Sequence, residues 1–476
     1  MVRTRRAITT GEASHRPTRR AIAFANKSNT KPSRAKPNPR PKFAVIDEQR
    51  FPVSPVLDTL FYFMAERHRI FLRRTSGEER PWTDDEILQK YPFTNVFRVY
   101  DRTTQYVLRH VVNQGSQDLH ESCFRVILFR MFNKIETWKH LKQQIGELTW
   151  ADFDVHTYEK VLGAVSGPLY GPAYICPAPN NIGGKFNYAR HLRLVQLLME
   201  ENLPKQLKRF RYLKDAHGWL LLFPSMGDFT ALQLILDLNM LPHFKWSEDE
   251  WVALGPGSKA CLHKIFGPSV SSHELSALEW LHTTQDEHFS RLGIPLDRRP
   301  RLCQSRRPGV TMVDLEHSLC ECEKYSRALH PEIKGKRTQV AKHLFVPKPT
   351  RPTADLPVNW LKRPPPVIKL TRPPPVREHD SAVKWEICRI VAERTRAAPA
   401  AHVPHYVLRW TGYGPDDDTC QPEKDLVGEA KEVLNAWRSM KERIWKRIGE
   451  FQKLSSAQLK DRRSQVAWVP NGQYVW

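Results

Sequence analysis

The chain has 476 residues, of which 40% are hydrophobic, and its formal net charge is +23. This length and apolar content predict two or three folded domains, which excludes a protein that is disordered throughout. No apolar run approaches the roughly 20 residues needed to cross a bilayer, and the N-terminus lacks the apolar core of a secretory signal. The sequence therefore favours a soluble, intracellular protein that does not enter membranes.

The eight cysteines are scattered and include no Cys-x-x-Cys pair. This spacing argues against a disulfide framework and against a zinc finger. His317 stands near Cys320 and Cys322, but two thiols one residue apart on a helix point to different faces. We therefore predict no bound metal and no cofactor.

Residues 1–42 are predicted to form a disordered basic arm. They include twelve Lys or Arg residues and one acid, Glu12, together with five prolines. Such arms bind polyanions by releasing condensed counterions. Clusters such as Arg3-Thr4-Arg5-Arg6 are typical of nuclear import signals. A mitochondrial transit peptide has a similar composition, so the arm alone does not decide between the nucleus and the mitochondrion.

Residues 43–345 are predicted to form a large all-α domain. Apolar residues recur at helical spacing at 56–64, 124–132 and 192–199, and alternation typical of strands is scarce. Thr83 followed by Glu86 is typical of a capping box at the start of a helix.

Two glycine loops in this domain are candidate phosphate sites. One contains Gly227, and the other runs Gly255-Pro256-Gly257-Ser258-Lys259. Backbone N–H groups at a helix start can hold an anion, and Lys259 adds positive charge. A generic turn between helices also uses glycine, so neither loop decides the matter alone.

The loop at Gly227 resembles the helix-hairpin-helix of base-excision DNA glycosylases. In that family a carboxylate further along the chain stabilises the developing sugar cation, and Asp249 stands at nearly the matching distance. Members that form a Schiff base carry a Lys where this chain has Phe229, so a lyase reaction is not expected. The alternative for Asp249 is an ordinary acid in the first turn of a helix.

Asn95, Arg98 and Arg102 form a polar group within an apolar stretch. On a helix, Arg98 and Arg102 would share one face and could clamp a phosphate or contact a base. The alternative is an ion pair with Asp101 or Glu66 inside the domain. The same two interpretations apply to three residues near the end of the domain, namely Glu316, His317 and Glu321.

Several motifs of this block occur together, namely Pro81-Trp82-Thr83, residues 93–102, Phe132-Asn133, Gly255-Pro256-Gly257 and residues 315–325. Together they resemble the helical domain that accompanies 5-hydroxymethyluracil DNA kinases. The resemblance implies a fold derived from DNA glycosylases, a DNA ligand and a flipped, modified base. Related proteins are proposed to act on hypermodified thymine as pyrophosphorylases or amino-group transferases.

A kinase needs a phosphate-binding loop of the form Gly-x-x-x-x-Gly-Lys-(Ser/Thr), and this sequence contains none. The chain is therefore not predicted to be a kinase by itself. Whether it catalyses another reaction on a base stays open.

Residues 346–380 are predicted to be a linker. They include Lys362-Arg363-Pro364-Pro365-Pro366 and an Arg-Pro-Pro-Pro run at 372–375. Proline runs favour polyproline II and lack the N–H donors that regular structure needs. We expect a semi-rigid, positively charged spacer.

Residues 381–452 are predicted to form a second, small domain, followed by a tail at 453–476. Runs at 385–391, 406–413 and 419–426 predict a three-stranded antiparallel sheet. Between Glu429 and Ile448 a helix is predicted, because apolar residues recur at helical spacing. These are Val433, Leu434, Trp437, Met440, Ile444 and Ile448.

The order of strand, Leu408-Arg409-Trp410-Thr411-Gly412-Tyr413, third strand and helix resembles the chromodomain family. The resemblance implies that Trp385, Trp410 and Tyr413 surround a methylated lysine of a histone tail, with Asp417 near the cation. Ring faces attract a methylammonium group by ~0.5–2 kcal/mol per favourable ring.

One departure from the chromodomain pattern is Cys420, where the family has Trp. The missing ring is expected to weaken the core of the small domain. The alternative for Trp410 and Tyr413 is that they only fill this core and bind no ligand.

The sequence thus predicts a multidomain, nuclear, chromatin-associated protein with two partners, DNA and a methylated histone tail. The first alternative is an enzyme that modifies or removes hypermodified thymine or 5-hydroxymethyluracil in DNA. A second alternative is a domesticated mobile-element protein. The oligomeric state is not predicted.

Overall fold

The structure, a computed structural model, describes residues 39–465 with gaps at Lys336, Pro349, 362–375, 378–382, 398–401 and Glu429. Residues 1–38 of the predicted arm, the proline runs of the predicted linker and the tail from residue 466 lie outside the described residues.

The helical domain opens with a short β-hairpin. Strand β1 (Phe43–Ile46) pairs antiparallel with β2 (Gln49–Pro52). The hairpin departs from the expectation of an all-α domain from residue 43, because four-residue strands are too short for their periodicity to show. Its buried side chains are Ala44, Ile46 and Phe51.

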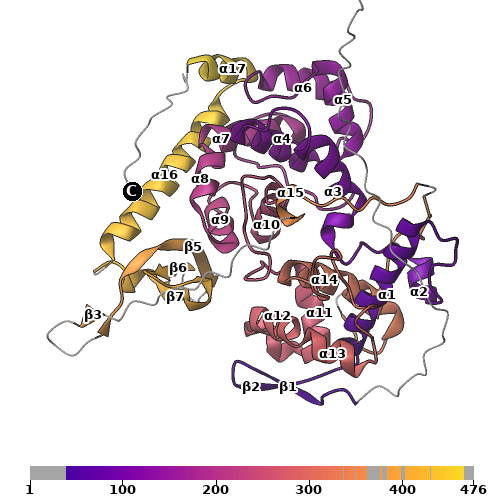
Figure 1. Cartoon of the computed structure of the whole chain (residues 1–476). Helices are drawn as coiled ribbons and strands as arrows, with labels where there is room; N and C mark the ends of the chain where they lie inside the picture. The colour runs from indigo at the N-terminus through magenta and orange to yellow at the C-terminus, as the bar shows by residue number, and fades with distance from the viewer. Residues whose placement is uncertain are drawn as a thin grey trace, which may run out of the picture. The chain divides into compact units, whose positions relative to one another are not determined.

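The rest of the domain is helical (Figure 1). Its first half comprises α1 (Val56–Ser76), α2 (Glu86–Lys90), the 3-10 helix η1 (Arg98–Tyr100), α3 (Arg102–Val107), the π-helix η2 (Leu108–Val112), α4 (Leu119–Phe132), α5 (Ile135–Ile145), α6 (Val155–Gly163) and α7 (Asn187–Glu200). Its second half comprises α8 (Leu203–Arg209), α9 (Leu213–Leu220), α10 (Asp228–Leu238), α11 (Pro256–Phe266), η3 (Pro268–Ser272), α12 (Glu274–Thr283), α13 (Gln285–Arg291) and α14 (Met312–Leu329).

The three predicted helical patterns at 56–64, 124–132 and 192–199 fall in α1, α4 and α7 and are confirmed. In the described part of the chain, no helix has both the length and the apolar character needed to cross a membrane.

The predicted capping box at Thr83 is replaced by a cap two residues later. The Asp85 carboxylate accepts a hydrogen bond from the Leu88 N–H at 2.9 Å, which satisfies one free donor at the start of α2. Thr83 instead donates its hydroxyl to the Glu66 carboxylate of α1.

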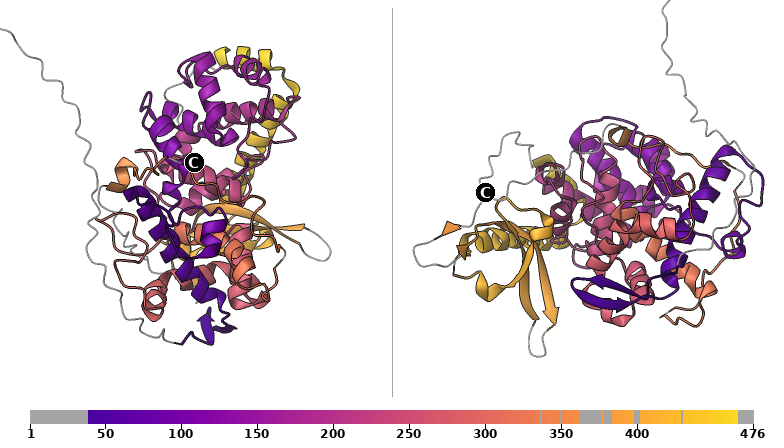
Figure 2. Two further views of the ribbon diagram at one scale, coloured as in Figure 1. Left: turned by 90° about the vertical axis from the view of Figure 1, so that its right-hand side faces the viewer. Right: turned by 60° about the horizontal axis from the view of Figure 1, so that its bottom comes forward.

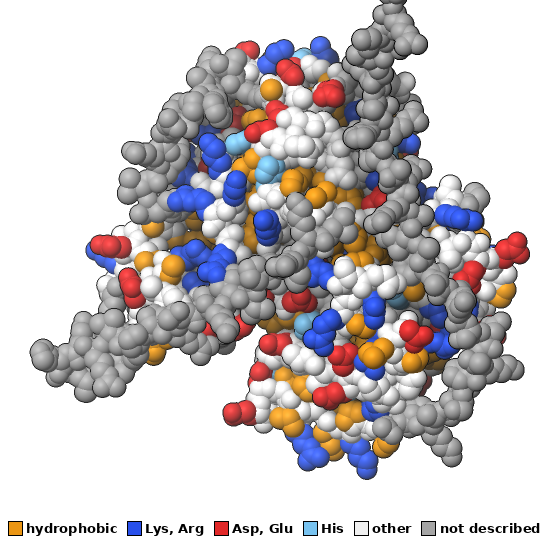
Figure 3. All heavy atoms as spheres, in the orientation of Figure 1, with side chains coloured by type: hydrophobic (Ala, Val, Ile, Leu, Met, Phe, Trp, Pro, Cys, Tyr) orange, Lys and Arg blue, Asp and Glu red, His pale blue; other side chains and the backbone are white. Residues whose placement is uncertain are grey.

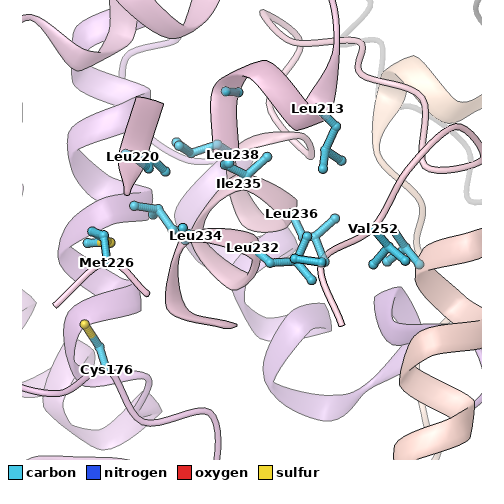
Figure 4. Packing of buried hydrophobic residues seen from close by; sticks show 14 of the residues in the cluster. Cys176, Leu213, Leu220, Met226, Leu232, Leu234, Ile235, Leu236, Leu238 and Val252 are labelled. Atoms are coloured by element: carbon cyan, nitrogen blue, oxygen red, sulfur yellow. The ribbon is translucent and has the colours of Figure 1, made fainter. Parts of the chain in front are cut away.

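Helix α10 is buried within the core of the domain. Its apolar side chains point to several sides of the helix (Figure 4), and they are Leu232, Leu234, Ile235, Leu236 and Leu238. A helix that is apolar all round is buried all round. Its three buried polar side chains, Thr230, Gln233 and Asp237, must therefore find partners inside the protein.

The predicted three-stranded sheet lies near the C-terminus, in the antiparallel order β5-β6-β7. Its strands are β5 (Ile387–Ala397), β6 (His402–Trp410) and β7 (Thr419–Pro422), with η4 (Pro415–Asp417) and η5 (Glu423–Asp425) on either side of β7. A two-stranded pair, β3 (Val376–Arg377) and β4 (Val383–Lys384), precedes this sheet. Cys420 is exposed on β7, so its side chain is not part of the buried core of the small domain.

Helix α16 (Lys431–Lys453) covers the sheet and is followed by α17 (Ser456–Gln465). Lys441 of α16 lies 2.7 Å from the Glu393 carboxylate of β5. Five of the six predicted apolar positions of the helix are buried, namely Leu434, Trp437, Met440, Ile444 and Ile448. The predicted amphipathic helix is thus confirmed and ends later than expected.

The sheet packs directly against the helical domain, where β5 lies beside α9 (Figures 1 and 2). A Cβ atom at Gly218 of α9 would lie 2.0 Å from the Val391 carbonyl oxygen of β5, so only glycine permits this approach. Beside it, the buried Asp215 carboxylate pairs with Arg389 of β5 and accepts a hydrogen bond from Arg409 of β6 at 2.9 Å. Backbone contact and buried ion pairs therefore fix the sheet to α9.

Part of the predicted linker also packs against the helical domain. The Thr353 hydroxyl donates to the Gln105 side-chain oxygen at 2.7 Å, and the Gln105 side-chain amide donates to the Asp355 carbonyl at 2.8 Å. Asn359 of α15 (Val358–Leu361) donates to two carbonyl oxygens that follow α10. Of the described linker residues, those at 353–361 are thus part of the folded body.

Lys and Arg side chains are frequent over the α8–α9 region of the face shown in Figure 3. The exposed basic residues in and after α8 are Lys205, Lys208, Arg209 and Arg211. This surface carries part of the chain's excess positive charge.

Candidate functional site

Helix α14 supplies most of the ionisable side chains of the candidate site. Thr311 caps the helix by accepting a hydrogen bond from the Asp314 N–H at 3.1 Å. The helix buries an unusual number of charged groups, namely Asp314, Glu316, His317, Glu321 and Glu323. Because buried charges are costly unless they are paired, each of these groups requires a partner or a ligand.

His317 lies at the centre of this group and is 6% exposed. Its Nε2 atom lies 3.5 Å from an Asp101 carboxylate oxygen, and its Nδ1 atom lies 3.2 Å from the Tyr174 hydroxyl oxygen. Burial opposes protonation of the ring, but Asp101, Glu321 and Glu316 outweigh it and raise the pKa of His317 above its ordinary value. The three side chains can hold a proton and deliver it to a neighbouring group.

An aromatic wall stands beside His317. The Tyr174 ring stacks on the Phe229 ring at 5.9 Å with an angle of 9° between their planes, and it also faces the His317 ring at 6.3 Å. Phe229 is 36% exposed, so its ring reaches the surface. Tyr174 has a φ of 53°, a left-handed conformation that is strained for a residue with a side chain.

The loop at residues 93–101 is tied to α14 at two places. The Thr94 N–H donates to the Glu321 carboxylate at 3.0 Å, and Asp101 faces His317. Within the loop, the Asn95 N–H donates to the Asp101 carboxylate at 2.8 Å. The Asn95 side-chain amide donates to the Tyr100 carbonyl at 2.7 Å. Asn95 therefore stabilises the conformation of the loop.

The second glycine loop begins α11 and is already bound to an acid. The Gly255 N–H and the Ser258 hydroxyl donate to one Glu316 carboxylate oxygen at 3.0 and 2.8 Å. The Glu316 carboxylate thus accepts the hydrogen bonds at the start of α11 that were predicted to bind a phosphate. A Cβ atom at Gly257 would lie 2.1 Å from the Cys320 sulfur, so this glycine permits α11 to approach α14.

The first glycine loop begins α10 and lies close to the second. A Cβ atom at Gly255 would lie 3.7 Å from the Phe229 ring, whereas a Cβ atom at Gly227 would meet nothing within 4 Å. Asp228 follows Gly227 and lies 2.9 Å from Arg394 of β5. Lys259 lies 3.0 Å from Glu274. The two predicted loops therefore meet at the exposed Phe229 ring.

Arg98 and Arg102 do not share a helical face, because Arg98 lies in η1 and Arg102 begins α3. Arg98 is buried, and its guanidinium donates to Asp237 at 2.6 Å and to Gln233 at 3.1 Å. Arg130 of α4 binds the same carboxylate. Burial opposes ionisation of Asp237, but the two guanidinium groups outweigh it and lower its pKa. Arg102 is exposed.

A second pair of carboxyl groups lines a small pocket next to Arg98. Burial and the neighbouring Asp314 raise the pKa of Glu248 to about 8, and burial raises the pKa of Asp314 to about 6. Asp249 lies next in the chain but is exposed, in a bend rather than in a helix, with its carboxylate 3.4 Å from His282. Its interpretation as an acid in the first turn of a helix is wrong.

Sequence reasoning missed several residues of this region, namely Arg130, Tyr174, Asp237 and Glu248. Asp237 and Gln233 interrupt the apolar pattern of α10, and this interruption is the signal that could have found them. Tyr174 lies in a segment without secondary structure, where no pattern marks it. In the described ranges, no group of three His, Cys, Asp or Glu side chains is arranged to hold a metal ion.

Two of the three predicted cage residues meet beside the C-terminal sheet, Trp385 just before β5 and Tyr413 just after β6. The Trp385 and Tyr413 rings lie 5.5 Å apart at 87°, and Trp385 is 45% exposed. Trp410 lies at the end of β6, opposite Ile387, and packs at the edge of the core. Asp417 lies in η4.

The helical domain and its buried acid–histidine cluster coincide with a family match. Residues 54–335, more than half of the chain, match the family described as 5-hmdU DNA kinase, helical domain, and the chain belongs to this family. A curated relative, the 5-hmdU DNA kinase of Bacillus phage SP10, is 25% identical over 309 residues. The match covers 59% of this chain and 47% of the relative, so the chain spans about half the relative's length. No solved structure matches the chain.

Proposed function

We propose that the helical domain binds DNA that carries a modified thymine and that His317, Asp101 and Tyr174 act on the modified base. The observation that carries the proposal is the convergence of these three residues, far apart in sequence, beside the exposed Phe229 ring. All of them lie within the segment that matches the family, and the phage relative is named a 5-hmdU DNA kinase.

Each residue has a chemical role in this proposal. The Phe229 ring stacks on an unstacked base, an interaction worth ~1–3 kcal/mol per base. When His317 is protonated, its Nδ1–H donates to the Tyr174 oxygen, so that the phenolic hydrogen can turn to an oxygen of the base or of its substituent. Asp101 stabilises the imidazolium and holds the ring in place. Phosphoryl transfer from ATP is no part of the proposal, because the sequence has no phosphate-binding loop.

The test compares oligonucleotides that differ only in one base, thymine or 5-hydroxymethyluracil. Fluorescence anisotropy measures binding to the full chain, and mass analysis of the nucleosides measures any conversion. We expect tighter binding of the modified strand, with the preference reduced about tenfold in Phe229→Ala, because the stacking surface is lost.

His317→Gln should keep DNA binding but lose the chemical change of the base. His110→Gln is the matched control, because it makes the same change at an exposed position outside the cluster. Equal binding of both strands together with an unchanged nucleoside profile would contradict the proposal.

We further propose that the C-terminal sheet binds a methylated lysine of a histone tail, as its resemblance to chromodomains implies. The favouring observation is the Trp385 ring, which is 45% exposed and perpendicular to the Tyr413 ring. Two rings at a right angle present faces to one cation, and a methylammonium group is bound by such faces.

The full chain should be titrated with histone peptides that differ only in lysine methylation. Trp385→Ala should abolish any preference for the methylated peptide. Trp445→Ala is the matched control, since this α16 ring is also 45% exposed and lies outside the cage. A wild-type protein that binds both peptides equally would show that the rings serve packing alone.

A further inference from the structure

A second pocket lies at the start of the loop at residues 93–101, where Phe93 lines it. It is formed by the second half of α1, the segment at 80–83, helix α2 and Phe345. Its lining includes three arginines, Arg67, Arg74 and Arg80, together with the Trp82 ring. Trp82 belongs to the Pro81-Trp82-Thr83 motif, which the proposed function leaves unused.

The pocket contains unbalanced positive charge. Among the described residues that line it, none is Asp or Glu. Arg67 is 6% exposed, and burial lowers its pKa to about 10. The charges of Asp101 and Glu321, which lie outside the pocket lining, oppose this shift, and Arg74 adds to it. One of its terminal nitrogens donates to the Phe93 carbonyl at 3.2 Å. The other, Nη1, is buried and has no hydrogen-bond partner in the described part of the chain.

A buried guanidinium nitrogen without an acceptor costs free energy, because its hydration is lost and nothing replaces it. Arg98 and Arg130 reduce that cost by pairing with Asp237. Asp101 and Glu321 favour the charge of Arg67, but no described acceptor reaches its Nη1 atom.

The other two arginines are held in place by aromatic rings. The Arg74 guanidinium lies 5.0 Å from the Trp82 ring centroid and 5.9 Å from that of Phe345. The Arg80 guanidinium lies 5.5 Å from the Trp82 ring centroid. Contacts with ring faces orient a guanidinium without neutralising it. Trp82 thus holds two cations beside the third.

We propose that this pocket binds a phosphate oxyanion through Arg67, Arg74 and Arg80. Guanidinium groups match phosphate in charge and in hydrogen-bond geometry, and three of them converge here without a competing carboxylate. The phosphate belongs either to the backbone of a bound nucleic acid or to a free phosphate ion. The site is separate from His317, so it goes beyond the proposed function.

The test is calorimetric titration of the full chain with inorganic phosphate at low ionic strength. We expect saturable binding with one phosphate per chain. Arg74→Gln and Arg80→Gln should each weaken it by about tenfold, because each removes a charge-assisted hydrogen bond. Arg298→Gln is the control, because it removes the same charge from an exposed position outside the pocket. It should leave the affinity within about twofold.

A competition measurement identifies the source of the phosphate. If phosphate displaces a labelled single-stranded oligonucleotide, and Arg74→Gln weakens both ligands, the pocket takes the nucleic-acid backbone. If Arg74→Gln weakens phosphate binding alone, the ligand is a free phosphate. His317→Gln should bind phosphate normally, which separates this site from the proposed catalytic cluster. No saturable binding, or equal binding by Arg74→Gln and Arg298→Gln, overturns the proposal.

Discussion

Two of the places where the helical domain buries arginines differ in the partners of these side chains. At the first, Arg98 and Arg130 share the Asp237 carboxylate, whose pKa is lowered by them. At the second, Arg67 lies beside Arg74 and has a buried nitrogen without an acceptor in the described chain. The difference teaches that burial alone does not assign a role to an arginine. Arg98 and Arg130 join helices through a shared carboxylate, whereas the Nη1 atom of Arg67 is available to a ligand.

The largest expected effect comes from breaking the paired cluster. Asp237→Asn leaves two buried guanidinium groups without their carboxylate, and we expect a loss of about 3–5 kcal/mol in the free energy of unfolding. Urea denaturation measures this loss. Asp249→Asn makes the same chemical change at an exposed position and should cost less than about 0.5 kcal/mol. A small effect of Asp237→Asn would mean that the ion pairs of Arg98 and Arg130 do not stabilise the fold, which would remove the contrast with Arg67.

A matched pair of arginine substitutions sharpens the comparison. Arg98→Met should cost about 2–3 kcal/mol, because Asp237 then keeps only Arg130 as a charged partner. Arg67→Met removes a buried charge that has no salt bridge among the described residues and loses one hydrogen bond, to the Phe93 carbonyl, so stability should change by less than about 1 kcal/mol. The same denaturation series compares both variants. A clear loss of stability in Arg67→Met would show that this arginine has a structural role.

The acids beside Arg98 should give a pH dependence of stability. The pKa of Glu248 is raised to about 8 from an ordinary value of 4.5, mainly by burial. Between these values the folded chain holds a proton that the unfolded chain has released, so stability falls as pH rises from 4.5 to 8. Glu248→Gln should remove roughly 1–2 kcal/mol of this fall, as measured by denaturation at pH 5 and pH 8. An unchanged pH profile would place Glu248 in contact with water.

The smallest expected effect is stabilisation by phosphate. A ligand present at about 100 times its Kd stabilises the folded state by about 2.7 kcal/mol, and a weak site at millimolar phosphate gives less, about 1 kcal/mol. The melting temperature should rise by a few degrees in wild type and not in Arg74→Gln. An equal rise in both proteins would assign the effect to general salt exclusion.

The sequence predicted the long elements well because their apolar periodicity is strong. Helices α1, α4 and α7, the C-terminal sheet and α16 were all foreseen. The hairpin at 43–52 and the packing of residues 353–361 were not, because short segments of mixed polarity carry no period.

The candidate site was predicted in part. The motifs at 93–102, 255–257 and 315–325 do come together, but their roles follow from three-dimensional pairing that spacing does not reveal. Arg98 binds Asp237, which was not singled out, and Glu316 fills the helix start that was expected to hold a phosphate. Partner choice among buried charges depends on which helices cross, and one sequence does not contain that information.

The contact at Gly218 has a consequence for how the chain tolerates change. Here the backbone of α9 contacts the Val391 carbonyl, and a Cβ atom added at Gly218 would lie only 2.0 Å from its oxygen. A methyl group at this position would push the sheet away from the helical domain. The Asp215 carboxylate would then lose its hydrogen bond from Arg409. The sheet and the helical domain are therefore joined at a point where even the smallest substitution, Gly218→Ala, disrupts the contact.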